Sequence, residues 1–264
     1  MAVGTLEAER RGTRPANLRV DWWWLQPAIT FVVLLGFVVY STWTVFTPHD
    51  FYAGPSVGRH YLSPYYSPCI TNRCKGGTTW NLVSWWPFSA GILMMPFPIL
   101  FRATCYYYRK AYYRSFWLSP PACAVPDAHG SYTGESRFPL ILQNLHRFAF
   151  YLIIPFPIIL LWEAIKGLEF GSGHWGLGLG SIILFVNAFL LGFYTLGCHA
   201  GRHICGGHLN AFSKGPVRYW VWKQMTRFNL HHMGWAWTSL VFVAWTDIYI
   251  RLVASGVIHD PRLF

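Results

Sequence analysis

Hydrophobic residues along this chain are gathered into five long blocks separated by more polar stretches. Apolar residues make up 53% of the 264 residues and charged residues only 12%, about half the charged share of typical soluble domains. A helix needs roughly 20 mostly apolar residues to cross a bilayer, and each block is close to that length. The blocks cover residues 23–46, 86–106, 148–165, 177–197 and 233–253. The pattern predicts an all-α polytopic membrane protein built as a five-transmembrane-helix bundle.

The stretches between the blocks define the rest of the organisation. Residues 1–22 form an N-terminal arm, and residues 23–264 form a single membrane domain. The first block is too long, too aromatic and too late in the chain to be a cleaved signal peptide, so all five helices should be retained. Residues 47–85, rich in Pro, Gly, Ser and Tyr, predict an ordered cap without regular structure. Residues 107–147 and 198–232 form the two long connections at the opposite face.

Positive charge is distributed unevenly between the two faces. Fifteen of the 21 Lys and Arg residues fall in the N-terminal arm and around the connections 107–147 and 198–232, and the other six fall on the opposite side. Cytoplasmic loops carry the excess of Lys and Arg, so the N-terminus is predicted to be cytoplasmic and the C-terminus outside. Topology therefore accounts for most of the +11 net charge. Nucleic acid is not expected as a partner, whereas anionic lipid or an acidic protein would suit the cytoplasmic surplus.

The second and third blocks share a short proline echo, "MMPFPILF" and "LIIPFPII". Proline inside a helix removes a backbone hydrogen bond and clashes with the preceding turn, so both helices are predicted to kink there. The kinks fit two interpretations, namely ordinary packing geometry or a widened cavity for a lipid-like substrate.

Cysteine and histidine residues concentrate on the predicted cytoplasmic side, which holds four of the six Cys and seven of the eleven His. On the outer side, Cys69 and Cys74 face an oxidising compartment, where disulfides persist, and a disulfide between them is predicted. The inner cysteines face a reducing compartment, which leaves metal ligation, packing or a thiol without a structural bond.

The string "CHAGRHICGGHLN" carries the densest group of these side chains. His199 and His203 are four positions apart, so on a helix they share one face about 6 Å apart and could hold one metal ion. Cys198 and Cys205 are seven apart, roughly 10 Å along a helix, too far to share one iron unless the helix unwinds at "CGG". The thiolates should therefore come from elsewhere, and Cys105 and Cys123 are available.

Two thiolates and two imidazoles suit either tetrahedral zinc or a Rieske-type [2Fe-2S] centre, in which two Cys hold one iron and two His the other. Buried packing without a metal, or a haem held by two His from different helices, also fits the residues. Spacing alone leaves these alternatives open.

The strings "FRATCYYYRKAYYRSFWLSPPACAVPD", "RFPLILQNLHRFAFYL", "HHMGWAWTSL" and "DIYIRLVASGVIHDPRLF" resemble the single-chain membrane anchor of actinobacterial succinate dehydrogenase, respiratory complex II. The similarity is strongest to the class with an embedded Rieske-type cluster in place of haem. It implies a multi-pass protein of the cell inner (plasma) membrane that works with flavoprotein and iron-sulfur subunits and delivers electrons to menaquinone. It also implies a trimer of the whole complex. No G-x-G-x-x-G motif opens a strand and helix in this chain, as a flavin-binding fingerprint would, so the subunit alone should not oxidise succinate.

The resemblance gives the candidate residues their roles. We expect a [2Fe-2S] centre with Cys105 and Cys123 on one iron and His199 and His203 on the other. The reserve ligands are Cys198, His146 and His232. Quinone reduction needs hydrogen-bond donors and a group that is protonatable near neutral pH. The residues at the right depth for such a pocket are Arg102, Tyr106, His146, Arg147 and His232.

Other interpretations remain for several of these side chains. Arg102 and Arg147 could instead snorkel to lipid headgroups, and His146 and His232 could cap helices or bond between them. A haem b-bearing anchor is the nearest rival in function. A non-enzymatic membrane protein with a structural metal site is another. A transporter should carry polar residues near mid-membrane, but Glu163 and Asp247 lie near the outer ends of their helices with no obvious partner.

Overall fold

The structure is a computed structural model of residues 1–264, and it describes all of them except 1–18, 72–81, 129–135, 139, 171–172 and 208. The described chain is mostly helical and forms two compact units. One unit comprises Met1–Gly36 and Ala103–Asn144, and the other comprises Phe37–Arg102 and Leu145–Phe264. We call them unit 1 and unit 2 and describe each by itself.

Among the residues that the structure describes, four helices are long and apolar enough to cross a membrane. They are α2 (Leu25–Phe46), the run Leu140–Lys166, α8 (Leu179–Leu196) and α11 (His232–Ala254). The run Leu140–Lys166 contains η5 (Leu140–Leu145), α6 (His146–Ile153) and α7 (Pro155–Lys166). Four of the five predicted spans are thereby confirmed.

The fifth predicted span, residues 86–106, is represented by a shorter apolar helix, Ala90–Ala103. It consists of α3 (Ala90–Met94) and α4 (Pro96–Ala103). The chain then leaves the helix and starts α5 (Tyr106–Ala111) with Cys105 in an extended conformation at its N-cap. The count of five spans and the orientation of the termini therefore stay predictions.

Both proline echoes divide their helices where expected. Met95 separates α3 from α4 directly before Pro96, and Ile154 separates α6 from α7 directly before Pro155. The missing N–H and the ring of proline explain why the regular helix stops at these positions.

Unit 1 contains the first part of the predicted connection 107–147, which is helical rather than a loop. After α5, the π-helix η3 covers Tyr112–Phe116. Phe31 of α2 packs on Phe116, with ring centroids 4.8 Å apart. Arg19 donates to the backbone oxygen of Cys123 (3.3 Å).

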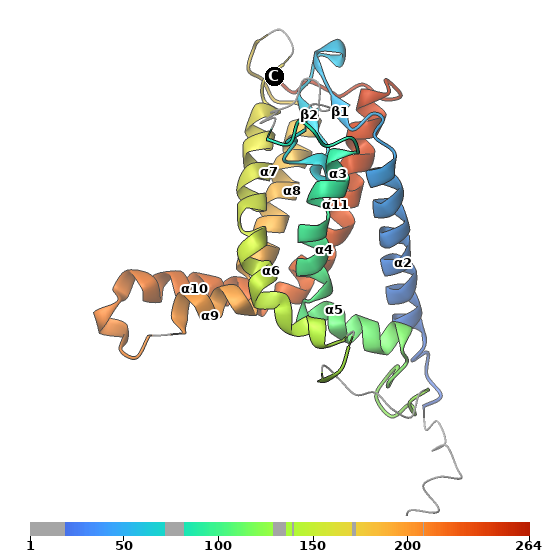
Figure 1. Ribbon diagram of the computed structural model, residues 1–264, viewed down its shortest axis with the longest axis vertical. Helices are drawn as coiled ribbons and strands as arrows, with labels where there is room; N and C mark the ends of the chain where they lie inside the picture. Colours follow the sequence, from blue (N-terminus) through green and yellow to red (C-terminus); the bar gives the residue numbers. More distant parts are fainter. Residues whose placement is uncertain (1–18, 72–81, 129–135, 139, 171–172, 208) are drawn as a thin grey trace, which may run out of the picture. The chain divides into compact units, whose positions relative to one another are not determined.

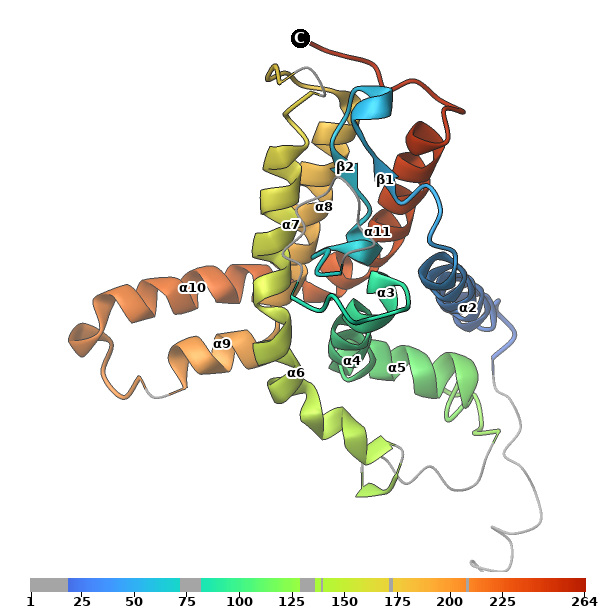
Figure 2. The ribbon, with the colours of Figure 1, turned by 45° about the horizontal axis from the view of Figure 1, so that its top comes forward.

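Unit 2 is organised around α8, which packs between α7 and α11 (Figures 1 and 2). Its core residues come from all three helices and include Ala164, Ile183, Leu184 and Ile250. Because α8 has helical neighbours on two sides, its buried side chains are more numerous than those of α7.

The cap, residues 47–85, closes one end of unit 2. The prediction that it lacks regular structure is wrong in detail, since β1 (Tyr52–Ala53) and β2 (Tyr61–Leu62) pair antiparallel. Two short 3-10 turns, η1 (Pro55–Val57) and η2 (Pro64–Tyr66), accompany them. The cap is well packed, since Tyr61, Tyr65 and Tyr66 are buried. Cys69 is buried and disulfide-bonded; its predicted partner, Cys74, lies outside the described residues.

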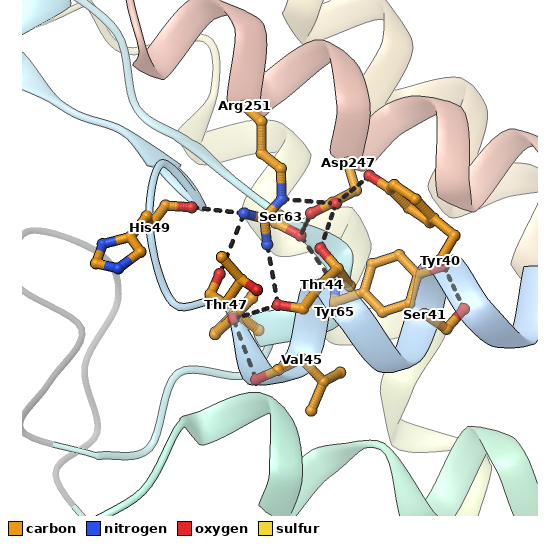
Figure 3. A network of polar contacts seen from close by, with 11 residues as sticks. Tyr40, Ser41, Thr44, Val45, Thr47, His49, Ser63, Tyr65, Asp247 and Arg251 are labelled. Carbon is orange, nitrogen blue, oxygen red and sulfur yellow. Dashed lines mark hydrogen bonds and ion pairs between the residues drawn. The ribbon is translucent and has the colours of Figure 1, made fainter.

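Asp247 anchors the cap end of the bundle, and the expectation that it lacks a partner is wrong (Figure 3). Its carboxylate is fully buried and accepts a hydrogen bond from Arg251 Nε at 2.9 Å. The other donors are the hydroxyls of Tyr40 (2.5 Å), Thr44 (2.7 Å) and Ser63. Arg251 also donates to the backbone oxygens of Thr44, Thr47 and His49. One buried ion pair thus joins α2, the cap and α11.

A second buried carboxylate, Asp260, ties the C-terminal segment to the same end. It accepts from Arg59 Nε (2.8 Å), from the hydroxyls of Tyr61 (2.9 Å) and Tyr249 (2.5 Å), and from the backbone N–H of Gly180 (2.7 Å). The Tyr61 ring lies so close to Gly180 that a Cβ there would come within 2.4 Å of it. Glycine is therefore required at this turn of α8.

The predicted connection 198–232 folds into a helical hairpin. Its helices are α9 (His199–Gly206) and α10 (Pro216–Leu230), with the short η6 (Phe212–Lys214) between them. In both views the two helices run side by side and crosswise to α7, α8 and α11 (Figures 1 and 2). Because α8 ends at Leu196, the histidine pair belongs to this separate helix.

Candidate functional site

Several of the chemically active side chains predicted from the sequence meet in unit 2, at the end opposite the cap. Arg102 lies near the end of α4, and His146 is the first residue of α6. Cys198 directly precedes α9, and His232 is the first residue of α11. Helix ends from four elements therefore supply polar groups to one region, which we call the polar cluster.

A thiol and an imidazole are in direct contact within this cluster. His146 Nε2 lies 3.0 Å from Cys198 Sγ, and Cys198 is buried. The same sulfur accepts from the backbone N–H of Ala200 (3.3 Å) and so caps α9. The His146 ring also stacks on Phe101 at 4.8 Å with an interplanar angle of 13°. These contacts hold the imidazole in a defined position. They also show His146 bonding between helices, which was one of the two roles that the sequence left open.

Arg102 points into the bundle. It donates to the backbone oxygen of Ala236 (3.1 Å) and to Ser239 Oγ (2.9 Å), both on α11. Its guanidinium lies 4.6 Å from the ring centre of Tyr194, which adds a cation–π attraction. The Tyr194 ring in turn stacks on His232 at 5.0 Å. The structure therefore favours an interior role for Arg102 over snorkelling to lipid.

Aromatic contacts join these two groups of residues into one. Phe101 meets Tyr194 edge to face at 5.3 Å. Positive charge on His146, His199 or Arg102 would repel a protonated His232. Ionisable side chains are costly inside a membrane, where they mark functional sites. A cluster with two histidines, one arginine and one thiol is therefore a strong candidate for the functional site.

The remaining predicted residues are placed differently. Cys105 and Tyr106 belong to unit 1, where Cys105 is buried and Tyr106 is exposed beneath the Arg109 guanidinium. Cys123 of the same unit is exposed. Arg147 is exposed on α6, as snorkelling would require. His203 lies one turn after His199 on α9, so the shared helix is confirmed.

The predicted ligand set Cys105, Cys123, His199 and His203 is divided between the two units, so its assembly stays a prediction. Among the described residues, no group of three or more His, Cys, Asp or Glu side chains is placed to hold one metal ion. No disulfide is formed by Cys105, Cys123, Cys198 or Cys205. The His146–Cys198 pair supplies the imidazole and thiol donors that zinc and Rieske-type centres use, so the side chains fit such a group in kind.

Three residues of the polar cluster were missed from the sequence, namely Phe101, Tyr194 and Ser239. Tyr194 stands four positions before Cys198 in an apolar helix, so it shares a helix-face spacing with a candidate ligand. Ser239 follows His232 by seven positions, two turns along the same face of α11. The first spacing would have identified Tyr194 and the second Ser239, whereas no spacing identifies Phe101.

Comparison with known proteins agrees with the resemblance seen in the sequence. Residues 25–256 match the family model described as "Actinobacterial succinate dehydrogenase subunit SdhC". A solved structure, "Mycobacterium smegmatis Sdh1 complex in the apo form", contains a chain that is 46% identical, with a TM-score of 0.84 and 97% of each chain covered. No curated protein matches the chain. The chain belongs to the family of actinobacterial succinate dehydrogenase SdhC subunits.

Proposed function

We propose that this subunit of succinate dehydrogenase, a quinone oxidoreductase, is the membrane anchor that passes electrons from the iron-sulfur subunit to menaquinone. The polar cluster is the observation that carries the proposal, because it places hydrogen-bond donors and protonatable groups at the end of a membrane bundle. Membership of the SdhC family supports other succinate dehydrogenase subunits as partners, and the proposed assembly is a trimer of the whole complex with flavoprotein and iron-sulfur subunits. The protein would lie in the plasma membrane with its N-terminus in the cytoplasm.

Reduction of a quinone takes two electrons and two protons, and the cluster has residues suited to each requirement. Arg102 has guanidinium N–H groups that can donate to a quinone oxygen, and its bonds to Ser239 and the Ala236 backbone oxygen hold it in position. His146 and His232 carry imidazoles, a side chain that can accept and donate protons. Tyr194 orients His232 by stacking on it. Tyr106 and Arg147 complete the proposed quinone-binding set.

A Rieske-type [2Fe-2S] centre is the proposed cofactor. Cys105, Cys123, His199 and His203 would hold it, with Cys198, His146 and His232 as alternative ligands. The centre would supply one-electron transfer between the iron-sulfur subunit and quinone. Cys105 is buried and His199 and His203 share α9. Cys123, His199 and His203 are exposed, so a bound cluster would have to cover these three side chains. Haem b between two histidines is the competing cofactor.

The quinone site can be tested with Arg102→Gln in the whole complex. We expect quinone-reductase activity with succinate to fall roughly 10- to 100-fold, because a charged hydrogen-bond donor contributes about 1.5–3 kcal/mol. Succinate oxidation with an artificial acceptor should be unchanged. Lys166→Gln, an exposed charge removed at the cap end of the bundle, is the matched control. Equal quinone reductase activity in both variants would contradict the assignment of Arg102.

The ligands can be tested with the double variant His199→Ala/His203→Ala. We expect it to lose iron from the membrane subunit and to stop quinone reduction, while artificial-acceptor activity remains. Unchanged quinone reduction would show that the ligands lie elsewhere. In that case His146→Ala/Cys198→Ala should produce the loss, because these two residues already form a partly buried pair of possible ligands.

The aromatic and basic segment Tyr106–Phe116 is the proposed platform for the iron-sulfur subunit. Its cations are Arg109, Lys110 and Arg114, and α5 with η3 orders the segment in unit 1. Reversing the charge of Lys110, which is exposed, should weaken retention of the iron-sulfur subunit during gel filtration. Full retention would argue against the platform.

A further inference from the structure

The hairpin of α9, η6 and α10 has a composition that the proposed electron-transfer role does not explain. Residues 198–232 contain five Lys or Arg residues and no Asp or Glu. Large apolar residues accompany them along α10, whose sequence is PVRYWVWKQMTRFNL. No residue of α10 is buried, so this helix offers a cationic and aromatic surface.

Two of the five cations hold the hairpin together. Arg218 of α10 donates to the backbone oxygens of Cys205 (2.6 Å) and Ile204 (3.2 Å) at the end of α9. Arg202 of α9 donates to Thr226 Oγ1 (3.0 Å), and its guanidinium lies 5.0 Å from the centre of the Trp222 ring. The hairpin is therefore a preformed surface and needs no partner to bring its helices together.

The outward face of α10 carries a mixed stripe of cations and apolar side chains. Trp220, Lys223, Arg227 and Leu230 follow one another at intervals of three or four residues, so they lie along one face of the helix. All four are exposed, Trp220 to 62% and Leu230 to 76%. Val217 adds exposed apolar surface beside them. Such interleaving is typical of helices that lie in the membrane interface, where tryptophan sits at headgroup level.

The position of the hairpin agrees with this assignment. It connects α8, which ends at Leu196, with α11, which begins at His232, and both are helices able to cross a membrane. The chain therefore leaves and re-enters the bilayer at the same face. In both views α9 and α10 run crosswise to α8 and α11 (Figures 1 and 2), as a hairpin lying along the bilayer surface would. Leu230 and Met233 are both exposed, so the apolar surface of α10 continues into the membrane span.

We propose that the exposed stripe of α10 binds the headgroups of anionic phospholipids. Lys223 and Arg227 would contact the phosphates, and Trp220 and Leu230 would lie among the glycerol and upper acyl groups. Each cation near an anionic surface contributes about 1 kcal/mol, or roughly 5-fold in affinity. An acidic protein would be attracted to the charge as well, but it would not explain the exposed apolar residues that run on into the span.

The test uses the intact purified complex and phosphatidylglycerol as the probe, with neutral phosphatidylcholine beside it. Native mass spectrometry of the detergent-solubilised complex gives the Kd for the first bound lipid. The wild type should prefer phosphatidylglycerol, and the preference should weaken at high ionic strength because salt screens exposed charges. The charge-removing variant Lys223→Gln/Arg227→Gln should bind phosphatidylglycerol roughly 5-fold more weakly for each charge removed. The charge-conserving variant Lys223→Arg/Arg227→Lys should bind like the wild type.

Each other outcome would overturn the proposal. A wild-type complex that shows no preference for phosphatidylglycerol over phosphatidylcholine would by itself overturn the proposal. An unchanged Kd in the charge-removing variant, with all subunits retained and artificial-acceptor activity intact, would place lipid binding elsewhere. Loss of another subunit from that variant, with its lipid preference unchanged, would show that the stripe docks a protein instead. None of these readouts depends on quinone reduction, so failure here leaves the proposed function to its own tests.

Discussion

Replacing Asp247 by alanine should destabilise unit 2 more than any change to an exposed charge. The carboxylate is fully buried and accepts from Arg251 and from the hydroxyls of Tyr40, Thr44 and Ser63 (Figure 3). Alanine removes the acceptor for all four donors at once. The Arg251 guanidinium, with a side chain only 11% exposed, would lose its counter-charge where little water can replace it.

The expected magnitude follows from this burial. Breaking a buried, hydrogen-bonded ion pair by removing one partner costs about 3–5 kcal/mol. At about 2–4 °C per kcal/mol for a chain of this size, the midpoint of thermal unfolding should fall by roughly 6–20 °C. The double variant Asp247→Leu/Arg251→Leu should recover part of the loss, because it leaves no unpaired charge behind.

Thermal unfolding of the detergent-solubilised complex, followed by the fraction that elutes intact in gel filtration, measures the effect. Glu169→Gln is the matched control. Glu169 pairs with Lys166 at 3.8 Å, but the side chains are 35% and 39% exposed, so the pair should contribute less than about 1 kcal/mol. If Asp247→Ala lowers the midpoint no more than Glu169→Gln does, the buried network does not stabilise the bundle and the reasoning fails.

Three further predictions concern single positions. Gly180→Ala should lower the unfolding midpoint, because its Cβ would meet a tyrosine ring at 2.4 Å, whereas Gly234→Ala, with nothing within 4 Å of its Cβ, should not; equal effects would refute the close approach. Asn187→Leu should stabilise the complex by about 1–3 kcal/mol, because both polar atoms of this buried amide have no hydrogen-bond partner among the described residues; a fall in the midpoint would show that the amide is bonded in the assembled complex. Burial raises the pKa of the Cys205 thiol, so alkylation of Cys205 should be slow at neutral pH and should accelerate only above the usual thiol pKa. Cys123 is exposed and should react first in the metal-free chain. A cluster bound to Cys123 should protect it from alkylation.

The sequence predicted most of the membrane architecture because bilayer thickness imposes a length on apolar helices. Four spans appear where the hydrophobic blocks lie, and the helices divide at Pro96 and Pro155 as the backbone chemistry of proline requires. The hairpin in 198–232 was not predicted. Its helices are stabilised by contacts such as the hydrogen bond from Arg218 to the end of α9. No long apolar block in the sequence predicts these helices.

The site was predictable in its residue types and less so in its pairings. Depth along the chain placed Arg102, His146 and His232 at one membrane end, and the structure brings them together in unit 2. The sequence could not predict which way the Arg102 side chain points, because its direction depends on hydrogen bonds to Ser239 and to a backbone oxygen of α11. Asp247 shows the same limit, since three of its four donors come from α2 and the cap, about 200 positions earlier in the chain.

Electron paramagnetic resonance of the reduced, purified complex tests the central claim most directly. The account predicts a Rieske-like signal that the His199→Ala/His203→Ala variant loses, while the signals of the iron-sulfur subunit remain. Absence of that signal in the wild type, together with the absorption band of a haem held by two histidines, would contradict it.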